Sequence, residues 1–536
     1  MAATEIYLNG DIVSMAPGHP AATSFAVRDG RFVAVGSEDE VHAVRSGPTR
    51  LVDLKGRTVV PGFIETHCHL SLYAMFRLQA NCATPPNRNI EEVKQEIEKM
   101  ARRVDGRSWV RGWGYDDTLI AERRHLTRQD LDDAAPETPV FVSHISGHLA
   151  YANSPALEIA GIGRHCRQPA GGEVELDSTG RPTGLIKEDA QGLLARHIPP
   201  YDHAELKTAM QEAMQDYYRA GITSAHDAAI GYFRDADQTL PIYEQLAAER
   251  QLALRTYLTV VEAEYHRLAE IGTRAGLAPG HLKPGAVKFF QDGSIQALTA
   301  ALEQPYHCQP HQRGSLLHKQ EILDKFVDTY HRRGCQIAIH ANGDRAIEST
   351  LCALEKACAR HPWRDHRHMI IHCQMANGDQ LQRMRRVGVV PSFFVNHVYY
   401  WGDRHAEIFL GVERAQRIDP LATAVKMGLP CTLHSDLPIT PVDPLFSMHC
   451  AVNRQTRDGV VLGPDERIRP LEALKAYTTW AARCSFDEAD KGCIAKGKLA
   501  DFAVLSGNPL ACEPEAINKI QVLQTVIGGK TVYRHS

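Results

Sequence analysis

Short apolar runs of strand length alternate with longer stretches of helical periodicity through most of the chain. This alternation is typical of βα units that build a parallel sheet. We count eight such runs, and eight βα units predict an α/β fold of the TIM-barrel type, (β/α)8. The predicted strands cover residues 58–67, 221–227, 254–260, 286–290, 336–340, 369–372, 387–392 and 430–436.

Both ends of the chain have a different pattern, in which short alternating strands are joined by glycine turns. Residues 6–13 and 25–36 each predict a hairpin, with an Asn-Gly or an Asp-Gly turn. Residues 500–505 predict a strand and residues 521–533 another hairpin. Neither end has enough strands for an independent core. We therefore expect the two ends to pair into one small β domain.

The predicted domains follow from these patterns. Residues 1–60 and 463–536 are expected to form a composite β-sandwich domain, and residues 61–462 the barrel. About 150 residues separate the first two barrel strands, which is far more than a βα crossover needs. Residues 77–205 are therefore expected to be a large insertion after strand 1, lying over the active site.

Two histidines, His67 and His69, lie at the end of the first predicted strand. Side chains two residues apart on a strand point to the same face. Two imidazoles on one face can bind a single cation such as Zn²⁺. Since the chain has 27 histidines, such a pair could be accidental, and the ends of the other strands must decide.

Those other strands carry residues of the same kind. Lys288 lies in the fourth predicted strand, while the fifth, sixth and eighth end in His340, His372 and Asp436. In a TIM barrel the C-terminal ends of the strands form the active site. Each residue alone could be a core histidine, a turn residue or a strand cap. Their joint placement instead predicts a hydrolytic metal site.

The composition excludes several classes of function. The chain has 536 residues, 23% of them charged, and a net charge of −4 without a basic stripe, so no nucleic acid is expected as a partner. There is no apolar run of membrane length and no signal peptide, so no membrane partner is expected. The 13 scattered cysteines lack a C-x-x-C pair, which favours reduced thiols and a cytoplasmic location.

Five segments together resemble the metal-dependent amidohydrolase superfamily, in its amidohydrolase family 3 branch. The resemblance covers nearly the whole chain and includes a strand-one metal motif, a lysine-DGS motif, an H-x-x-G-D-x-A motif, the S-D of strand eight and a C-terminal signature. These segments are residues 61–69, 287–294, 339–346, 434–436 and 492–502.

This resemblance implies two groups of metal ligands. His67, His69 and Asp436 would bind one ion, and His340 and His372 a second. Lys288 is often carboxylated in such enzymes, which would give an anionic bridge between the ions. A free ammonium has no lone pair for a metal, whereas a carbamate has two oxygens. Some relatives bind one ion, so we expect one or two divalent metal ions, with Zn²⁺ as the first choice.

The resemblance also implies a reaction, the hydrolysis of a non-peptide C–N bond by metal-activated water. Asp436 would act as the general base and then protonate the leaving amine. Residues 397–405 are similar to a segment of N-substituted formamide deformylases, which favours a small-molecule amide-type substrate. A deaminase, lactonase or isomerase, and a non-catalytic binding protein, remain as alternatives. The sequence leaves a homodimer open.

Five residues are candidates for contacts with the substrate. The segment around His148 resembles a family segment whose histidine faces the pocket. Asp292 follows Lys288 closely and could line the barrel mouth. Aromatic side chains could form an apolar wall, although each could equally belong to a core; these are Trp113, Tyr399 and Trp401.

Overall fold

A computed structural model gives the fold of the chain. The residues that it describes are 4–18, 22–45, 47–103, 108–145, 149–164, 166–169, 172–232, 236–273 and 280–535. They form two compact units, one of Met1–Ser71 with Met214–Ser536 and the other of Leu72–Ala213. Within the described residues, the strands make sheets of four, five, six and eight strands.

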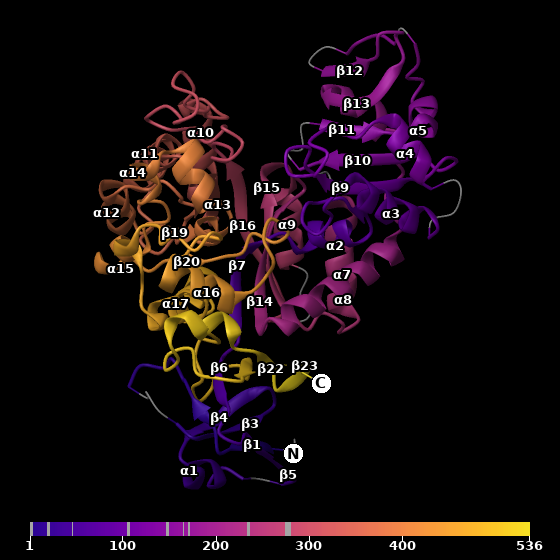
Figure 1. Cartoon of the computed structure of the whole chain (residues 1–536). Coiled ribbons are helices and arrows are strands. Elements are labelled where there is room, and N and C mark those ends of the chain that lie inside the picture. Colours follow the sequence, from indigo (N-terminus) through magenta and orange to yellow (C-terminus); the bar gives the residue numbers. More distant parts are fainter. Residues whose placement is uncertain are drawn as a thin grey trace. The chain divides into compact units, whose positions relative to one another are not determined.

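The eight-stranded sheet is the parallel barrel of the first unit, in the order β20-β19-β18-β17-β16-β15-β14-β7 (Figure 1). The two strands at the ends of this order, β7 and β20, meet at their C-terminal ends. There Asp436 N donates to His67 O (3.2 Å) and His69 N donates to Leu437 O (2.8 Å). This nearly closed barrel confirms the predicted fold class. The strands are β7 (Phe63–Cys68), β14 (Ile222–Ile230), β15 (Arg255–Val261), β16 (Leu282–Phe290), β17 (Ile337–Ala341), β18 (Met369–His372), β19 (Val390–Phe393) and β20 (Thr432–Leu433).

The first predicted strand is in fact two strands. The apolar run that starts at Thr58 forms β6 (Thr58–Pro61) and then β7, and only β7 belongs to the barrel. Gly62 separates them and its N–H donates to Asp501 O (3.0 Å) in the terminal sheet. A Cβ at Gly62 would lie 2.2 Å from the side chain of Thr223, so this close approach requires glycine.

Helices follow the barrel strands, and their caps explain one error in the predicted strands. Strand seven was expected from Val387, but α12 (Gly378–Val387) still includes this residue and ends at Gly388, whose φ of 92° is left-handed. The other helical segments of this unit are α8 (Ala236–Ala248), η2 (Glu262–Glu264), α9 (Tyr265–Thr273), α10 (Gln320–Arg332), α11 (Asp344–Arg360), α13 (Asn396–Arg404), η3 (His405–Phe409), α14 (Val412–Ala415), α15 (Leu421–Lys426), α16 (Pro444–Asn453), η4 (Pro464–Glu466), α17 (Pro470–Ala476) and α18 (Thr479–Cys484).

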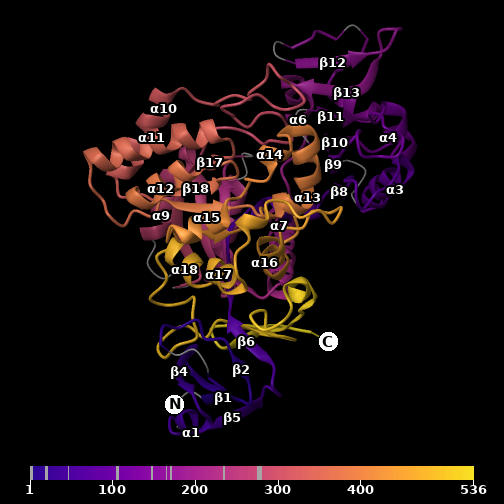
Figure 2. The ribbon, with the colours of Figure 1, turned by 60° about the vertical axis from the view of Figure 1, so that its left-hand side comes forward.

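Both ends of the chain meet in the same β-rich part of the first unit (Figures 1 and 2). One sheet has the order β4-β3-β1-β5 and the other β2-β6-β21-β22-β23, so the second combines strands from both termini. The strands and helices of this part are β1 (Thr4–Leu8), β2 (Asp11–Ile12), β3 (Ser24–Arg28), β4 (Arg31–Gly36), α1 (Glu38–His42), β5 (Thr49–Asp53), β21 (Phe502–Leu505), η5 (Pro514–Lys519), β22 (Val522–Ile527) and β23 (Lys530–Arg534).

The core between these sheets is aromatic. The ring of Phe25 stacks on Tyr7 with centroids 4.6 Å apart and meets Phe502 edge-on at 5.0 Å. The predicted hairpins at 25–36 and 521–533 are confirmed as β3–β4 and β22–β23. The hairpin predicted at 6–13 is wrong, because β1 pairs with β3 and β5 while β2 pairs with β6 in the other sheet. The domain boundaries stay a prediction.

The second unit has its own six-stranded sheet, in the order β12-β13-β11-β10-β9-β8. It contains the whole range 77–205 predicted as an insertion, whose place over the active site stays a prediction. Among the described residues, no helix is long and apolar enough to cross a membrane. The elements are β8 (Ala80–Asn81), α3 (Ile90–Ala101), β9 (Val110–Tyr115), α4 (Arg128–Ala134), β10 (Val140–His144), β11 (Leu149–Ala152), α5 (Ser154–Ile159), β12 (Gly172–Leu176), β13 (Pro182–Glu188), η1 (Asp189–Gln191) and α6 (Gly192–Ala195), with α2 (Leu70–Arg77) and α7 (His203–Arg219) at the boundaries.

Candidate metal centre

Three of the predicted ligands lie where the first and last barrel strands meet. His69 Nε2 is 3.2 Å and His67 Nε2 is 3.4 Å from Asp436 Oδ1. One ligand atom from each residue lies within 4.8 Å of the others. Asp436 Oδ1 is buried and has no hydrogen-bond partner among the described residues. A buried carboxylate oxygen without a hydrogen-bond donor, between two imidazoles, keeps its lone pairs for binding a cation.

The other three predicted ligands lie beside this group. Lys288 Nζ is 3.5 Å from His67 Nε2, and His372 Nε2 is 3.0 Å from His340 Nδ1. The rings of His67 and His372 meet edge-on with centroids 5.5 Å apart. The structure therefore brings together residues from the ends of strands β7, β16, β17, β18 and β20.

Backbone carbonyls fix the orientation of two imidazoles. His69 Nδ1 is 2.8 Å from Ala228 O, and His340 Nε2 is 3.1 Å from Gly293 O. Because a carbonyl can only accept, these ring nitrogens carry the proton and donate. The other ring nitrogens, Nε2 of His69 and Nδ1 of His340, then carry lone pairs toward the centre. Metal-binding histidines are commonly oriented in this way.

The electrostatics of the centre favour neutral nitrogen ligands. Burial lowers the pKa of His340 to about 4 and lowers the pKa of His67 and His372 well below the usual value. Burial also lowers the pKa of Lys288 to about 7, so much of this amine is neutral near neutral pH. Burial opposes ionisation of Asp436, but the adjacent His69 keeps its pKa below the usual value. Imidazole nitrogens with a carboxylate suit a divalent transition metal.

Glu65 is a further residue of the candidate metal centre, for which the sequence predicted no role. Glu65 is fully buried and lies two residues before His67 on the same strand. Its carboxylate accepts the N–H groups of His67 (3.3 Å) and Ser435 (3.2 Å). It therefore links the strand of His67 to the segment of Asp436. Burial raises the pKa of Glu65 to about 8. The alternation Glu65-x-His67-x-His69 is the sequence signal that could have identified it.

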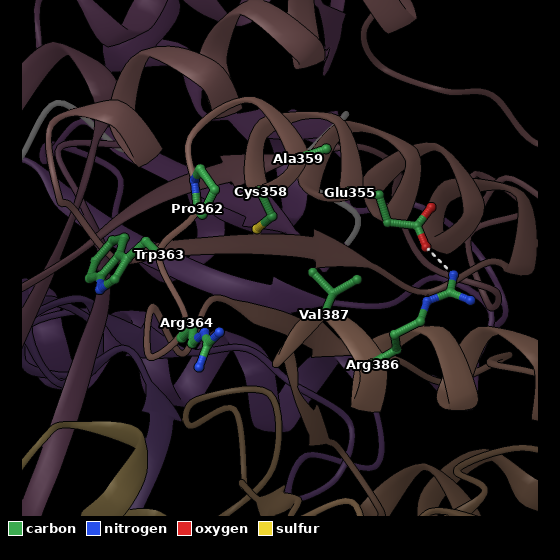
Figure 3. A pocket seen from close by; sticks show the side chains of 8 residues that line it. All are labelled: Glu355, Cys358, Ala359, Pro362, Trp363, Arg364, Arg386 and Val387. Carbon is green, nitrogen blue, oxygen red and sulfur yellow. Dashed lines mark hydrogen bonds and ion pairs between the residues drawn. The ribbon is translucent and has the colours of Figure 1, made fainter.

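A surface pocket of about 420 Å³ lies elsewhere on the barrel exterior and contains none of these residues (Figure 3). An ion pair between Glu355 and Arg386 (3.0 Å) crosses it. Burial raises the pKa of its one thiol, Cys358, to about 11, so this cysteine is not an activated nucleophile. The pocket is lined by Glu355, Cys358, Ala359, Pro362, Trp363, Arg364, Arg386 and Val387.

Comparison with known proteins shows the family to which this chain belongs. A family model described as "Amidohydrolase family" matches residues 50–533. The chain belongs to the amidohydrolase family. It is 30% identical over 540 residues to the putative amidohydrolase YtcJ of Bacillus subtilis, with 99% of each chain covered. It is also 30% identical to the N-substituted formamide deformylase of Arthrobacter pascens, with 99% of this chain and 98% of that protein covered.

A solved structure supports the same placement. An uncharacterized metal-dependent hydrolase from Pyrococcus horikoshii matches with a TM-score of 0.78 and 25% identity, covering 95% of this chain and 99% of that one. This amidohydrolase is therefore a member of a family of metal-dependent hydrolases, as the sequence motifs predicted.

Asp292 of this amidohydrolase is buried, and its carboxylate accepts three backbone N–H groups. Its Oδ1 accepts the N–H of Asn342 (2.9 Å), and its Oδ2 accepts those of Ala301 (2.9 Å) and Gly343 (2.8 Å). These bonds use both oxygens and hold the loop that follows His340. Asp292 therefore positions the loop after His340, and its role as a substrate contact stays a prediction.

The other predicted substrate contacts lie in different surroundings. Trp113 belongs to the second unit, where it stacks on Phe76 at 4.4 Å, and His148 lies outside the described residues. Tyr399 packs against Phe446, with ring centroids 4.9 Å apart. Trp401 is 5.7 Å from His397 (ring centroids), whose own ring lies 6.3 Å from His372.

Sequence reasoning missed an aromatic pair beside the ligands. The ring of Phe290 lies 5.6 Å from that of His340 and 5.0 Å from Lys288 Nζ, and it packs on Tyr232 at 4.7 Å. Tyr232 is 55% exposed, so the pair joins the buried centre to the surface of its unit. Phe290 is two residues after Lys288, which is the strand-face signal that could have found it.

Proposed function

We propose that this amidohydrolase cleaves the C–N bond of a small amide-type substrate at the centre described above. The observation that carries the proposal is the donor set itself, in which the unpartnered Asp436 Oδ1 faces His67 and His69. A bound divalent ion would supply the Lewis acidity that lowers the pKa of water from about 16 toward about 7. Zn²⁺ is our choice of ion because imidazole and carboxylate donors suit it.

The roles of the chain's own residues follow from their positions. His67, His69 and Asp436 would hold one ion, and His340 and His372 a second. Asp436 also accepts a proton from the attacking water and delivers it to the leaving nitrogen, a contribution of about 10²–10⁴-fold. No serine or cysteine nucleophile is required.

Lys288 completes the proposed centre as a carbamate. Its burial favours the neutral amine, which is the form that has a lone pair for reaction with carbon dioxide. The two carbamate oxygens can then bind two ions, which the amine cannot. Mass spectrometry of the intact protein at neutral pH, before and after acidification, would detect the added carbon dioxide.

An N-substituted formamide is the substrate class that the relatives favour. The Arthrobacter pascens protein named for that activity is similar to this chain over nearly its whole length. The experiment is a screen of N-substituted formamides, acylated amines and N-acyl amino acids against the zinc-loaded protein, with release of acid and amine followed by mass spectrometry. A chelator-treated sample is the control. Release of ammonia from a heterocycle, with every amide intact, would replace the proposal by deamination.

A further inference from the structure

Strand β19 brings no metal ligand to the centre, and the helix that follows it brings a histidine. Beyond β19 the chain continues through Phe394 into α13, which carries His397. The His397 ring is 3% exposed and packs on Phe394 with centroids 4.4 Å apart. Its centroid lies 6.3 Å from that of His372. His397 therefore borders the metal centre without belonging to the ligand set.

Behind His397 lies a carboxylate that is completely buried. Asp419 is 0% exposed, and neither of its side-chain oxygens has a hydrogen-bond partner among the described residues. Its Oδ1 is 3.8 Å from His397 Nδ1, a nitrogen that is buried and also without a partner. A buried carboxylate without hydrogen bonds is strongly unfavourable, so a structure that retains one at this position has a use for it.

The backbone at Asp419 is anchored on both sides by hydrogen bonds. Its N–H donates to Gln374 O (2.8 Å), and its carbonyl accepts Arg454 Nη1 (3.0 Å). Its φ of 48° is in the left-handed region, which aspartate tolerates better than most residues. With this backbone fixed, Oδ1 of the side chain lies 3.8 Å from His397 Nδ1.

Arg454 does not neutralise the carboxylate through a direct bond. Its guanidinium donates to the backbone carbonyls of Leu462 (2.7 Å), Asp419 (3.0 Å) and Ile418 (2.7 Å). His397 Nδ1, 3.8 Å from Oδ1, can donate to Asp419 when it carries the ring proton. A movement of about 1 Å brings the pair to hydrogen-bond distance.

We infer that Asp419 and His397 form a dyad that recognises the N–H of a secondary amide, an inference that rests on the proposed function. Asp419 accepts Nδ1–H and so fixes the tautomer in which Nε2 carries the lone pair. Nε2 then accepts a hydrogen bond from the substrate N–H and orients the leaving nitrogen toward Asp436. His397 is a substrate-contacting residue in this arrangement, and Asp419 is a positioning residue. The substrate class is thereby narrowed to amides that keep an N–H.

The test compares a secondary amide with its N-methylated tertiary analogue, which has no N–H. A site built to bind a donor discriminates strongly against an analogue that lacks it. His397→Phe should lower kcat/KM for the secondary amide by about 10²-fold and change that for the tertiary amide by less than about threefold. Asp419→Asn should lower the first value by about 10–100-fold, because its amide can donate to Nδ1 and so favour the other tautomer.

Controls separate this role from a structural one. His397→Gln keeps an acceptor and should restore part of the discrimination, while the double variant of His397→Phe and Asp419→Asn should be no worse than His397→Phe alone. His405→Phe is the matched control, since this buried histidine lies 6.1 Å from His397 (ring centroids) and has no place in the dyad. Metal content and thermal midpoint are measured for every variant. Equal losses for both amides, or no loss, overturn the inference.

The inference and the proposed function can fail separately. If the wild-type protein hydrolyses amides and Asp436→Asn does not, the proposed function stands, whatever His397→Phe shows. If no amide is hydrolysed, a crystal structure of the metal-loaded protein decides the dyad alone. His397 Nδ1 within about 3.2 Å of an Asp419 oxygen supports it, and a ring turned away from Asp419 overturns it.

Discussion

A buried ion pair joins the barrel to the terminal sheet, and its removal should be costly. Arg255 on β15 binds Asp501, next to β21, through Nε–Oδ2 (2.6 Å) and Nη2–Oδ1 (3.0 Å). The two side chains are 6% and 3% exposed. Asp501 Oδ1 also accepts the N–H of Gly528 (2.7 Å), and Arg255 Nη1 donates to Gly280 O (2.9 Å).

Asp501→Asn leaves the guanidinium buried without its counter-charge. Removing one partner of a buried pair typically costs about 3–5 kcal/mol, so we expect the free energy of unfolding to fall by about that amount. Replacing both partners, with Arg255→Met and Asp501→Leu, removes the unpaired charge as well. The double variant should therefore be less destabilised than Asp501→Asn.

A different ion pair, which joins residues near the two ends of the chain, supplies the matched control. Arg31 Nη1 is 2.9 Å from Asp490 Oδ1, but these side chains are 46% and 52% exposed. Asp490→Asn should cost less than about 1 kcal/mol, because water screens the pair. Urea unfolding followed by circular dichroism measures all the variants. If Asp501→Asn and Asp490→Asn shift the transition equally, the reasoning from burial is refuted.

Two further predictions concern acid stability and proton transfer. Burial lowers the pKa of His366 and lowers that of His368 well below the usual value, so both stay neutral in the fold while the unfolded chain takes up protons below about pH 6.5. The free energy of unfolding therefore decreases as the pH drops below about 6.5. His368→Gln should reduce this decrease by about 1.4 kcal/mol per pH unit, as measured by urea titrations at several pH values. An unchanged pH dependence would contradict the assignment. Asp436→Asn should lower kcat by at least about 10²-fold, because an amide cannot accept the proton of water. Metal analysis of the same sample shows whether the ion is retained, and near-normal kcat with bound metal would exclude Asp436 from proton transfer.

Much of the fold was accessible from the sequence because it depends on local periodicity. The alternation of strand and helix patterns predicted the barrel, and spacing by two placed His67 and His69 on one face. The division of residues 58–69 at Gly62 was missed because the apolar run continues on both sides of it, although Pro61-Gly62 is a break signal. Which sheet each half joins is decided by partners far along the chain, such as Asp501, whose carbonyl accepts the N–H of Gly62.

The candidate site shows the same limit for side chains. Strand ends indicated which residues meet, but they could not indicate which donors each carboxylate accepts. Asp292 follows a motif lysine, and only the fold shows that its carboxylate accepts three backbone N–H groups. Asp419 precedes a proline and reads as a turn residue, and only the fold shows that it faces His397. Such pairings depend on tertiary contacts that leave no local pattern.

The direct connection from β6 to β7 determines how early in synthesis the candidate site can form. β6 is flanked in its sheet by β2 and by β21, and β21 is one of the last strands of the chain to be synthesised. The segment that leads into the strand of His67 is therefore paired on both sides only when synthesis has reached about residue 505. Contacts of such long sequence separation form slowly. The strand of the candidate metal ligand His67 is thus completed by one of the last segments to emerge, and a fully anchored candidate site is a product of the finished chain.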